Sequence, residues 1–235
     1  MPKPAGPRDE VSIVTAGENA VMVYFGDRIS PDVGDRVRQS ASRIRSTLGD
    51  SVLELVPSYA SLLVVYDPWR IGRGTLRRTL NALLADVEAG DKGSIRRLDL
   101  PVYYGEETGP DLPRVAAHGS IDTTAVIALH SNREYRVYAM GFAPGFAYMG
   151  SVPNALAAPR HASPRRQIPP GSVAIAGEQT AIYPQQSPGG WNIIGRCPVD
   201  LFHPDKSPPT LLEPGDRVIF RAISRDEFLS LGGHL

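Results

Sequence analysis

The chain has 235 residues, with 25 Lys and Arg balanced by 25 Asp and Glu, so its formal net charge at pH 7 is zero. The length allows one large domain or two small ones, and a composition that is 42% hydrophobic and 21% charged is typical of globular proteins. The lack of a basic excess argues against general nucleic-acid binding.

The first ten residues contain no apolar segment of the kind found in a signal peptide. No stretch approaches the roughly 18 apolar residues of a membrane span. We therefore expect a soluble, cytoplasmic protein without membrane association, with residues 1–9 forming a flexible tail.

Residues 10–98 are predicted to form a small α+β sandwich domain. Two β-rich runs bounded by glycine, residues 11–17 and 20–26, precede a helix, and two further strand patterns, residues 51–57 and 60–66, follow it. A second helix and a further strand complete the pattern. This order favours helices on one face of an antiparallel sheet.

Both helices of this domain carry clear signals. Ser30 is an N-cap candidate with proline at the next position, and Gly49 ends the first helix. The second helix is predicted within residues 74–90, where leucines recur at helical spacing.

Residues 99–235 are predicted to form a small β-barrel or sandwich. A strand, an acidic Gly-Pro turn and two short helices come first, and brief β-branched or aromatic runs bounded by Gly or Pro follow. These runs are residues 135–140, 172–177, 179–184, 191–196 and 217–222.

The last predicted helix begins after Ser224, which has Glu227 at capping-box spacing. Phe228 and Leu231 are expected to dock on the barrel. Earlier in this half, His118 and His130 end the two short helices, where we expect an imidazolium to interact with the helix dipole.

The segment from residue 141 to residue 190 is unusually rich in glycine and proline, yet too apolar for a linker. Glycine permits positive φ or close approach of a ligand, and proline fixes the backbone shape. Phe142, Phe146, Tyr148 and Trp191 are candidates for flat walls of a pocket or partner surface. The equal alternative is a barrel with tight turns and an aromatic core.

Arg160 and Arg165 each follow a proline, with His161 between them. The proline before each arginine fixes the local backbone, and this would direct both guanidinium groups at a carboxylate or phosphate. The alternative is a pair of surface arginines on a loop.

Other chemical signatures are sparse. The polar residues Gln179, Thr180 and Tyr183 either line a cavity or face water. The single cysteine, Cys197, excludes an intrachain disulfide and is expected to be a small buried side chain. The sequence contains no GxxxxGK[ST], HExxH or CxxC motif, so we predict no metal site and no nucleotide cradle on this chain.

Five stretches together resemble one protein family. They are residues 30–38, 56–68, 132–150, 159–196 and 211–220, and they extend over nearly the whole chain. The family is that of the B-type subunit of 5-oxoprolinase, also called allophanate hydrolase subunit 1 or the KipI family.

This resemblance implies an α+β N-terminal domain followed by a mainly-β cyclophilin-like barrel. It also implies a non-autonomous subunit of an ATP-dependent 5-oxoprolinase, which converts 5-oxo-L-proline to L-glutamate together with A-type and C-type subunits. The C-type subunit is the allophanate hydrolase subunit 2 or KipA-like protein. ATP is then used by the assembled complex rather than clearly bound by this chain.

The family signature implies a substrate or partner pocket in the second domain but no catalytic residue, since the signature is not a catalytic motif. This chain departs from the common pattern at Ala147, Glu178 and His203. The pocket candidates, which include the neighbouring Tyr148, are Gly141, Phe142, Pro144, Gly145, Phe146, Tyr148, Arg160, Arg165, Gln179, Thr180, Tyr183, Gly189, Gly190, Trp191 and Arg196.

Two alternative functions remain at this point. One is a regulatory binding protein that inhibits a sensor histidine kinase through the same barrel face. The other is a component of an allophanate hydrolase or of a urea amidolyase-type carboxyl transfer system.

Overall fold

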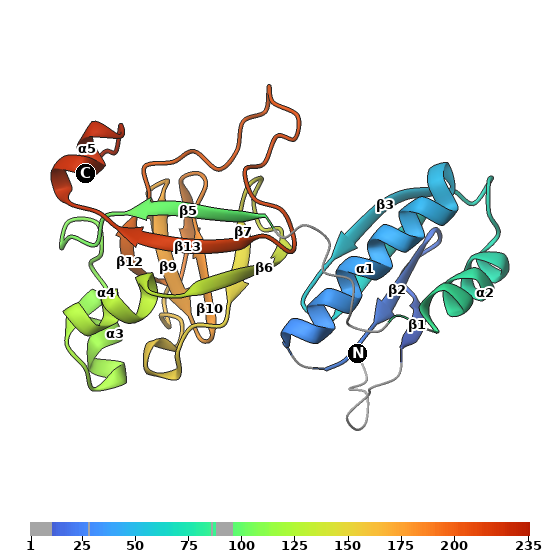
Figure 1. Cartoon of the computed structure of the whole chain (residues 1–235), viewed down its shortest axis with the longest axis horizontal. Coiled ribbons are helices and arrows are strands. Elements are labelled where there is room, and N and C mark those ends of the chain that lie inside the picture. Colours follow the sequence, from blue (N-terminus) through green and yellow to red (C-terminus); the bar gives the residue numbers. More distant parts are fainter. Residues whose placement is uncertain (1–10, 28, 86, 88–95) are drawn as a thin grey trace. The chain divides into compact units, whose positions relative to one another are not determined.

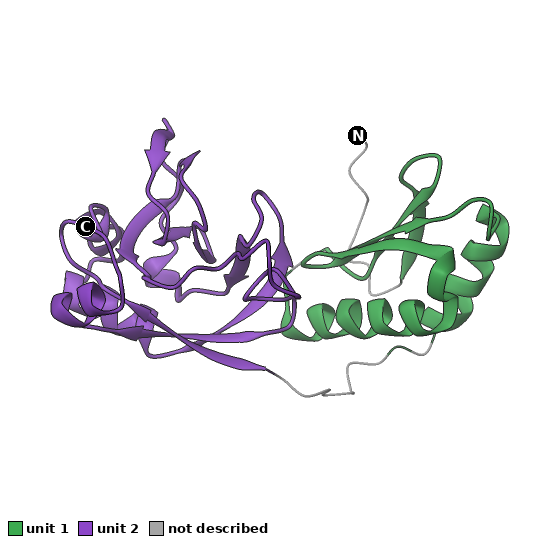
Figure 2. Ribbon diagram, turned by 90° about the horizontal axis from the view of Figure 1, so that it is seen from above, with its two compact units in different colours: residues 1–94 green, residues 95–235 purple. Residues whose placement is uncertain are grey.

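A computed structural model describes residues 11–27, 29–85, 87 and 96–235. The chain divides into two compact units, residues 1–94 and residues 95–235 (Figure 2). The expected tail at residues 1–9 lies outside the described part. Within that part, no helix has both the length and the apolar character needed to cross a membrane.

Unit 1 is a four-stranded antiparallel sheet in the order β1-β2-β4-β3 with two helices (Figure 1). Its elements are β1 (Ser12–Thr15), β2 (Ala20–Tyr24), α1 (Pro31–Leu48), the short 3-10 helix η1 (Gly49–Ser51), β3 (Val52–Pro57), β4 (Ser61–Tyr66) and α2 (Arg73–Leu84). The predicted order of strands and helices is confirmed. The strand expected after α2 pairs instead with the sheet of unit 2.

Local capping explains where α1 begins and ends. The Ser30 hydroxyl accepts a hydrogen bond from the backbone N–H of Val33 at 3.2 Å, and Gly49 ends the helix with a positive φ of 47°. The helices and alternate residues of the sheet then bury one shared core: Val21, Val23, Val37, Ile44, Leu62, Val64, Leu76, Leu80 and Leu84.

Unit 2 is built on a nearly closed mixed sheet in the order β12-β9-β10-β7-β6-β13-β5. The two edge strands approach each other where Tyr103 and Arg196 exchange two backbone hydrogen bonds of 2.9 Å. The strands are β5 (Arg97–Val102), β6 (Glu134–Met140), β7 (Ala147–Gly150), β9 (Ser172–Ala176), β10 (Gln179–Ile182), β12 (Asn192–Arg196) and β13 (Arg217–Ala222). A barrel-like second unit is therefore confirmed.

Three short strands of unit 2 were not predicted from the sequence. β7 is in the main sheet, while β8 (Arg165–Ile168) and β11 (Ser187–Gly189) form a separate two-stranded ribbon. Proline within β11 is typical of such an edge position, because it removes a backbone donor and hides the strand pattern.

The helices of unit 2 are α3 (Leu112–Gly119), α4 (Thr123–Ser131), the 3-10 turn η2 (Asn154–Leu156) and α5 (Arg225–Ser230). Figure 1 shows α3 and α4 together, with α5 apart from them. The capping of α5 by Ser224 is confirmed, and Phe228 is buried against Tyr103. The expectation for Leu231 is wrong, since its side chain is 49% exposed.

His130 corrects the expected dipole role at the end of α4. It is fully buried and stacks on Phe220, with ring centroids 4.6 Å apart. Its Nδ1 lies 2.8 Å from the Tyr104 hydroxyl and its Nε2 lies 2.9 Å from the Thr180 hydroxyl, so both ring nitrogens have a hydrogen-bond partner. Burial lowers the pKa of His130 to about 3, so the ring is neutral and serves as a polar link within the core.

We expect acid to destabilise the chain through His130. In the unfolded chain the pKa of this side chain is near 6.5, so above that pH His130 does not reduce the free energy of unfolding. Below it, the free energy of unfolding falls by about 1.4 kcal/mol per pH unit as the pH drops toward 3. Urea unfolding between pH 4 and 8 measures this slope. Glutamine does not titrate, so in His130→Gln the free energy of unfolding should fall less steeply with decreasing pH. The difference in slope should be about 1.4 kcal/mol per pH unit, which corresponds to one proton. Equal slopes in both proteins would contradict the assignment.

Candidate functional site

The turn between β6 and β7 presents an exposed aromatic side chain. Gly141 N–H donates to the Phe146 carbonyl at 3.2 Å, and Phe146 N–H donates to the Ala143 carbonyl at 3.0 Å. Inside this turn Phe142 has a φ of 72° and a 60% exposed side chain. A bulky residue in the left-handed region costs about 1–2 kcal/mol, and such strain is typical of functional sites.

Phe142 is the outer member of an aromatic platform, which we define as Phe142, Phe146, Tyr148, Tyr183 and Trp191. Phe146 is its centre: its ring is edge-on to the other four, with centroids 4.8–5.8 Å away. Phe146, Tyr183 and Trp191 are buried, whereas Tyr148 is half-buried. The platform therefore combines the two interpretations of the sequence, because its inner rings form a core and the Phe142 ring is exposed.

Glycines make this packing possible at two places. A Cβ on Gly189 would lie 2.3 Å from the Tyr183 hydroxyl oxygen, so only glycine fits beside that ring. Gly145 has a φ of 84° and packs against Phe202 and the Leu201 carbonyl. Burial raises the pKa of Tyr183 to about 12, so its hydroxyl is a neutral hydrogen-bonding group.

Arg160 lies over the platform. Its guanidinium carbon is 5.5 Å from the centroid of the Trp191 ring, a cation–π contact, and the residue is exposed. Within the described part of the chain this guanidinium has no ion-pair partner. It is the cation of the site that is placed to meet a ligand.

Arg165 is placed differently, because its guanidinium is already bound to protein. Its Nη2 donates to Asp111 Oδ1 at 2.8 Å, and the Asp111 carboxylate is 6% exposed. The pair with Asp111 uses Arg165 Nη2, and the convergence of Arg160 and Arg165 on one anion stays a prediction.

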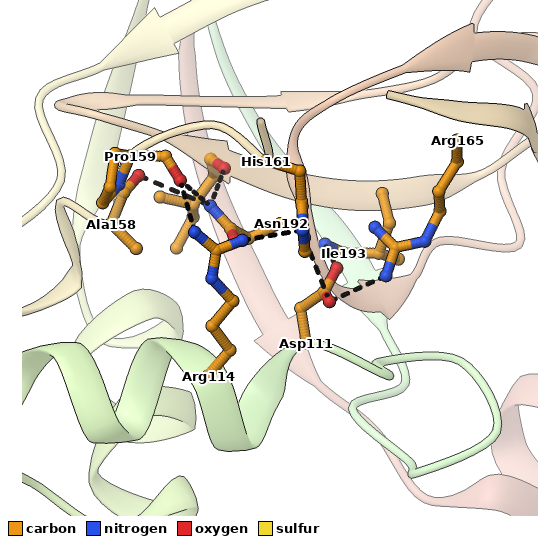
Figure 3. Close-up of polar contacts among 9 residues, drawn as sticks. Asp111, Arg114, Ala158, Pro159, His161, Arg165, Asn192 and Ile193 are labelled. Carbon is orange, nitrogen blue, oxygen red and sulfur yellow. Dashed lines mark hydrogen bonds and ion pairs between the residues drawn. The ribbon is translucent and has the colours of Figure 1, made fainter. Parts of the chain in front are cut away.

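Asp111 is the centre of a polar network (Figure 3). Its Oδ2 accepts from the backbone N–H of Ile193 at 2.7 Å, and its own N–H donates to the Ile193 carbonyl at 2.9 Å. His161 Nε2 lies 3.2 Å from Oδ1, out of line for a well-formed hydrogen bond, so this contact is mainly electrostatic. Arg114 and Arg165 approach His161 and Asp111 from opposite sides.

Arg114 and Asn192 tie the Arg160 loop, residues 159–165, to the barrel. Arg114 Nη1 lies 2.7 Å from His161 Nδ1, and its Nη2 donates to the Pro159 carbonyl at 3.4 Å. The fully buried Asn192 donates to the same carbonyl at 3.1 Å. His161 is thus part of this network, whereas Asp111, Arg114 and Asn192 were not predicted from the sequence.

Several other candidates lie away from the platform. Thr180 points to the opposite face of β10 and binds His130, so it is part of the barrel core. Gln179 is half-buried at the start of β10, beside Gly150 in the sheet register. Gly141 and Pro144 are exposed in the turn, and Gly190 accepts a hydrogen bond from the His161 N–H at 2.7 Å.

Arg196 is in a separate pocket of about 690 Å³, lined also by Phe228 and residues 231–235. Its Nη1 donates to the His234 carbonyl at 2.6 Å. Cys197 lies beside it and is buried, as expected, with its pKa raised to about 12 by burial. Arg196 is thus not part of the platform.

The arrangement has the chemistry of an anion-binding surface rather than of a metal centre. Among the residues that the structure describes, no group of three or more His, Cys, Asp or Glu side chains could hold a metal ion. Aromatic faces and one available guanidinium suit a small planar ligand with a carboxylate or phosphate.

Comparisons with known proteins show which family the chain matches. Residues 11–212 match the family model described as carboxyltransferase domain, subdomain C and D. The chain is 39% identical over 222 residues to the B-type subunit of 5-oxoprolinase from Bacillus subtilis, covering 90% of this chain and 92% of that protein. The corresponding 5-oxoprolinase protein of Escherichia coli O157:H7 is also 39% identical, over 87% of this chain and 92% of its own length.

Among solved structures, that of TTHA0988 has a TM-score of 0.77 and 38% identity over 87% of this chain. This chain spans only 40% of that longer protein.

We expect Phe142→Gly to leave the free energy of unfolding within about 1 kcal/mol of the parent, because relief of the positive φ offsets the lost ring contacts. Phe146→Ala is the matched comparison and should cost about 3–5 kcal/mol, since it opens a cavity in the centre of the platform. Urea unfolding of both variants tests this. A loss for Phe142→Gly as large as for Phe146→Ala would show that Phe142 is a core residue.

Proposed function

The chain belongs to the family of 5-oxoprolinase B-type subunits, and we propose that it supplies one face of the lactam site in an ATP-dependent hydrolase that converts 5-oxo-L-proline to L-glutamate. In this proposal it works in the cytoplasm with A-type and C-type subunits and is inactive alone. The nearly closed sheet of unit 2 would then be a cyclophilin-like barrel.

The chemistry sets clear demands on the site. A lactam resists water because attack must break amide resonance, and ATP makes attack feasible by activating the lactam oxygen. The enzyme must then hold the substrate carboxylate, offer donors to developing negative charge and exclude bulk water.

The proposal depends on the exposed guanidinium of Arg160 over the Trp191 ring. It is the exposed guanidinium of the site, it is ordered by the Trp191 ring, and it has no carboxylate partner among the described residues. A charge-assisted pair with the substrate carboxylate would place the flat lactam ring against the platform. We assign this role to Arg160 rather than to Arg165, because Arg165 is paired with Asp111.

The platform is open on this chain alone, which supports closure by a second polypeptide. Phe142 is 60% exposed in a strained turn, a conformation that a covering partner would stabilise. We assign the covering role to the C-type subunit. The sequence lacks a GxxxxGK[ST] loop, so we assign ATP to the assembled complex rather than to this chain.

We expect Arg160→Ala to lower kcat/KM of the assembled three-subunit enzyme for 5-oxoproline about 10- to 100-fold, the value of a charge-assisted hydrogen bond. The measurement is ATP-dependent glutamate release, with allophanate and urea assayed in parallel. Arg166→Ala removes an equally charged exposed residue of the same segment and should retain parental activity.

Two outcomes would count against the proposal. Parental turnover by Arg160→Ala would remove Arg160 from the site. Glutamate release by the A-type and C-type subunits without this chain, or turnover of allophanate or urea in place of 5-oxoproline, would overturn the assignment of the reaction.

A further inference from the structure

We propose that Asp111 is a positioning residue that fixes the Arg160 loop over the aromatic platform and so sets the affinity for the substrate carboxylate; this rests on the function proposed above. Asp111 does not reach the platform itself. It acts through Arg165 and His161, which follow Arg160 on the same loop.

Hydrogen bonds to β12 and α3 hold Asp111 in place. Its backbone N–H and its Oδ2 both pair with Ile193 on β12, at 2.9 Å and 2.7 Å. Its carbonyl accepts from the Val115 N–H at 3.0 Å, which starts α3. The carboxylate is therefore fixed by a strand and a helix, and its Oδ1 is left to face the loop.

The His161 ring lies between Arg114 and Asp111. A guanidinium can only donate, so the 2.7 Å contact with Arg114 Nη1 requires an unprotonated Nδ1. The proton of the neutral ring is then on Nε2, which faces Asp111 Oδ1 at 3.2 Å. Arg114 thus holds the ring in one tautomer, and the Asp111 carboxylate lies next to Nε2.

Hydrogen bonds fix the Arg160 loop on both sides of Arg160. Pro159 is bound through its carbonyl by Arg114 and Asn192, and the His161 N–H donates to the Gly190 carbonyl at 2.7 Å. Arg160 lies between these two fixed residues, next to Trp191. Its guanidinium can cover the ring only while both neighbours keep their places.

The negative charge of Asp111 compensates the positive charge of Arg165, so the position of the loop depends on Asp111. Arg114 and Arg165 bring two positive charges to a partly buried region, and Asp111 is the carboxylate that pairs directly with Arg165. Without it, the half-buried Arg165 guanidinium would be uncompensated and would move toward water. The loop would then follow Arg165 away from the barrel.

The test is Asp111→Asn in a Trp69→Phe background. Asparagine can keep the bond to Ile193 N–H through its carbonyl oxygen while presenting a donor to Arg165 and His161. Trp69 is 95% exposed, so its replacement leaves Trp191 as the single tryptophan at little structural cost. Acrylamide quenching of Trp191 fluorescence then reports whether Arg160 covers the ring.

We expect Asp111→Asn to raise the quenching constant of Trp191 to that of Arg160→Ala. In the assembled enzyme the KM for 5-oxoproline should rise about tenfold while kcat changes less than about twofold. Asp205→Asn, an exposed carboxylate on another loop, is the matched control and should change neither value.

Unchanged quenching and unchanged KM in a folded Asp111→Asn variant would overturn the proposal. If that variant does not fold, Arg165→Lys tests the same link, because lysine keeps the charge but loses the planar fork. Unchanged quenching there would likewise overturn it. Quenching is measured without turnover, so an inactive assembly would contradict the proposed function and leave this inference to be judged on the quenching of Trp191.

Discussion

The buried carboxylate of Asp111 is the interaction on which the site depends. It joins the edge of β12, the start of α3 and the loop that carries Arg160, three segments far apart in sequence. A buried charge is stable only when it is paired and hydrogen-bonded, and Asp111 meets this condition with a guanidinium and a backbone N–H. The same condition ties the loop to the barrel and so determines where the loop can present a cation.

The aromatic platform is a core cluster that continues to the surface of unit 2. Phe146 and Trp191 are packed as in any barrel interior, whereas Phe142 continues the cluster into solvent. The inner rings make the outer one rigid, since edge-on contacts fix its orientation. A rigid aromatic wall loses little conformational entropy on binding, which would favour the proposed closure by a second subunit.

The barrel beneath has its own polar constraint in His130. A neutral ring bonded to Tyr104 and Thr180 connects α4 to β10 inside the core, so the helices and the sheet keep one relative position. This position matters for the site because α3, which carries Arg114, packs against α4. A structural histidine thereby supports the geometry around a second histidine, His161.

The sequence alone determined the elements of unit 1, the β-rich second half, the family and the segment that contains the platform, because these depend on local periodicity, caps and long motifs. The tertiary structure decided which charges meet. Asp111 is some fifty residues from His161 and Arg165, and an aspartate before a helix is ordinarily a capping or turn residue, so its sequence context carried no sign of its partners. The alternation of a strand puts Thr180 and Tyr183, three residues apart, on opposite sides. Only the tertiary structure decided that the Thr180 side is the barrel core and the Tyr183 side the platform, because the packing partners of each side come from distant parts of the chain.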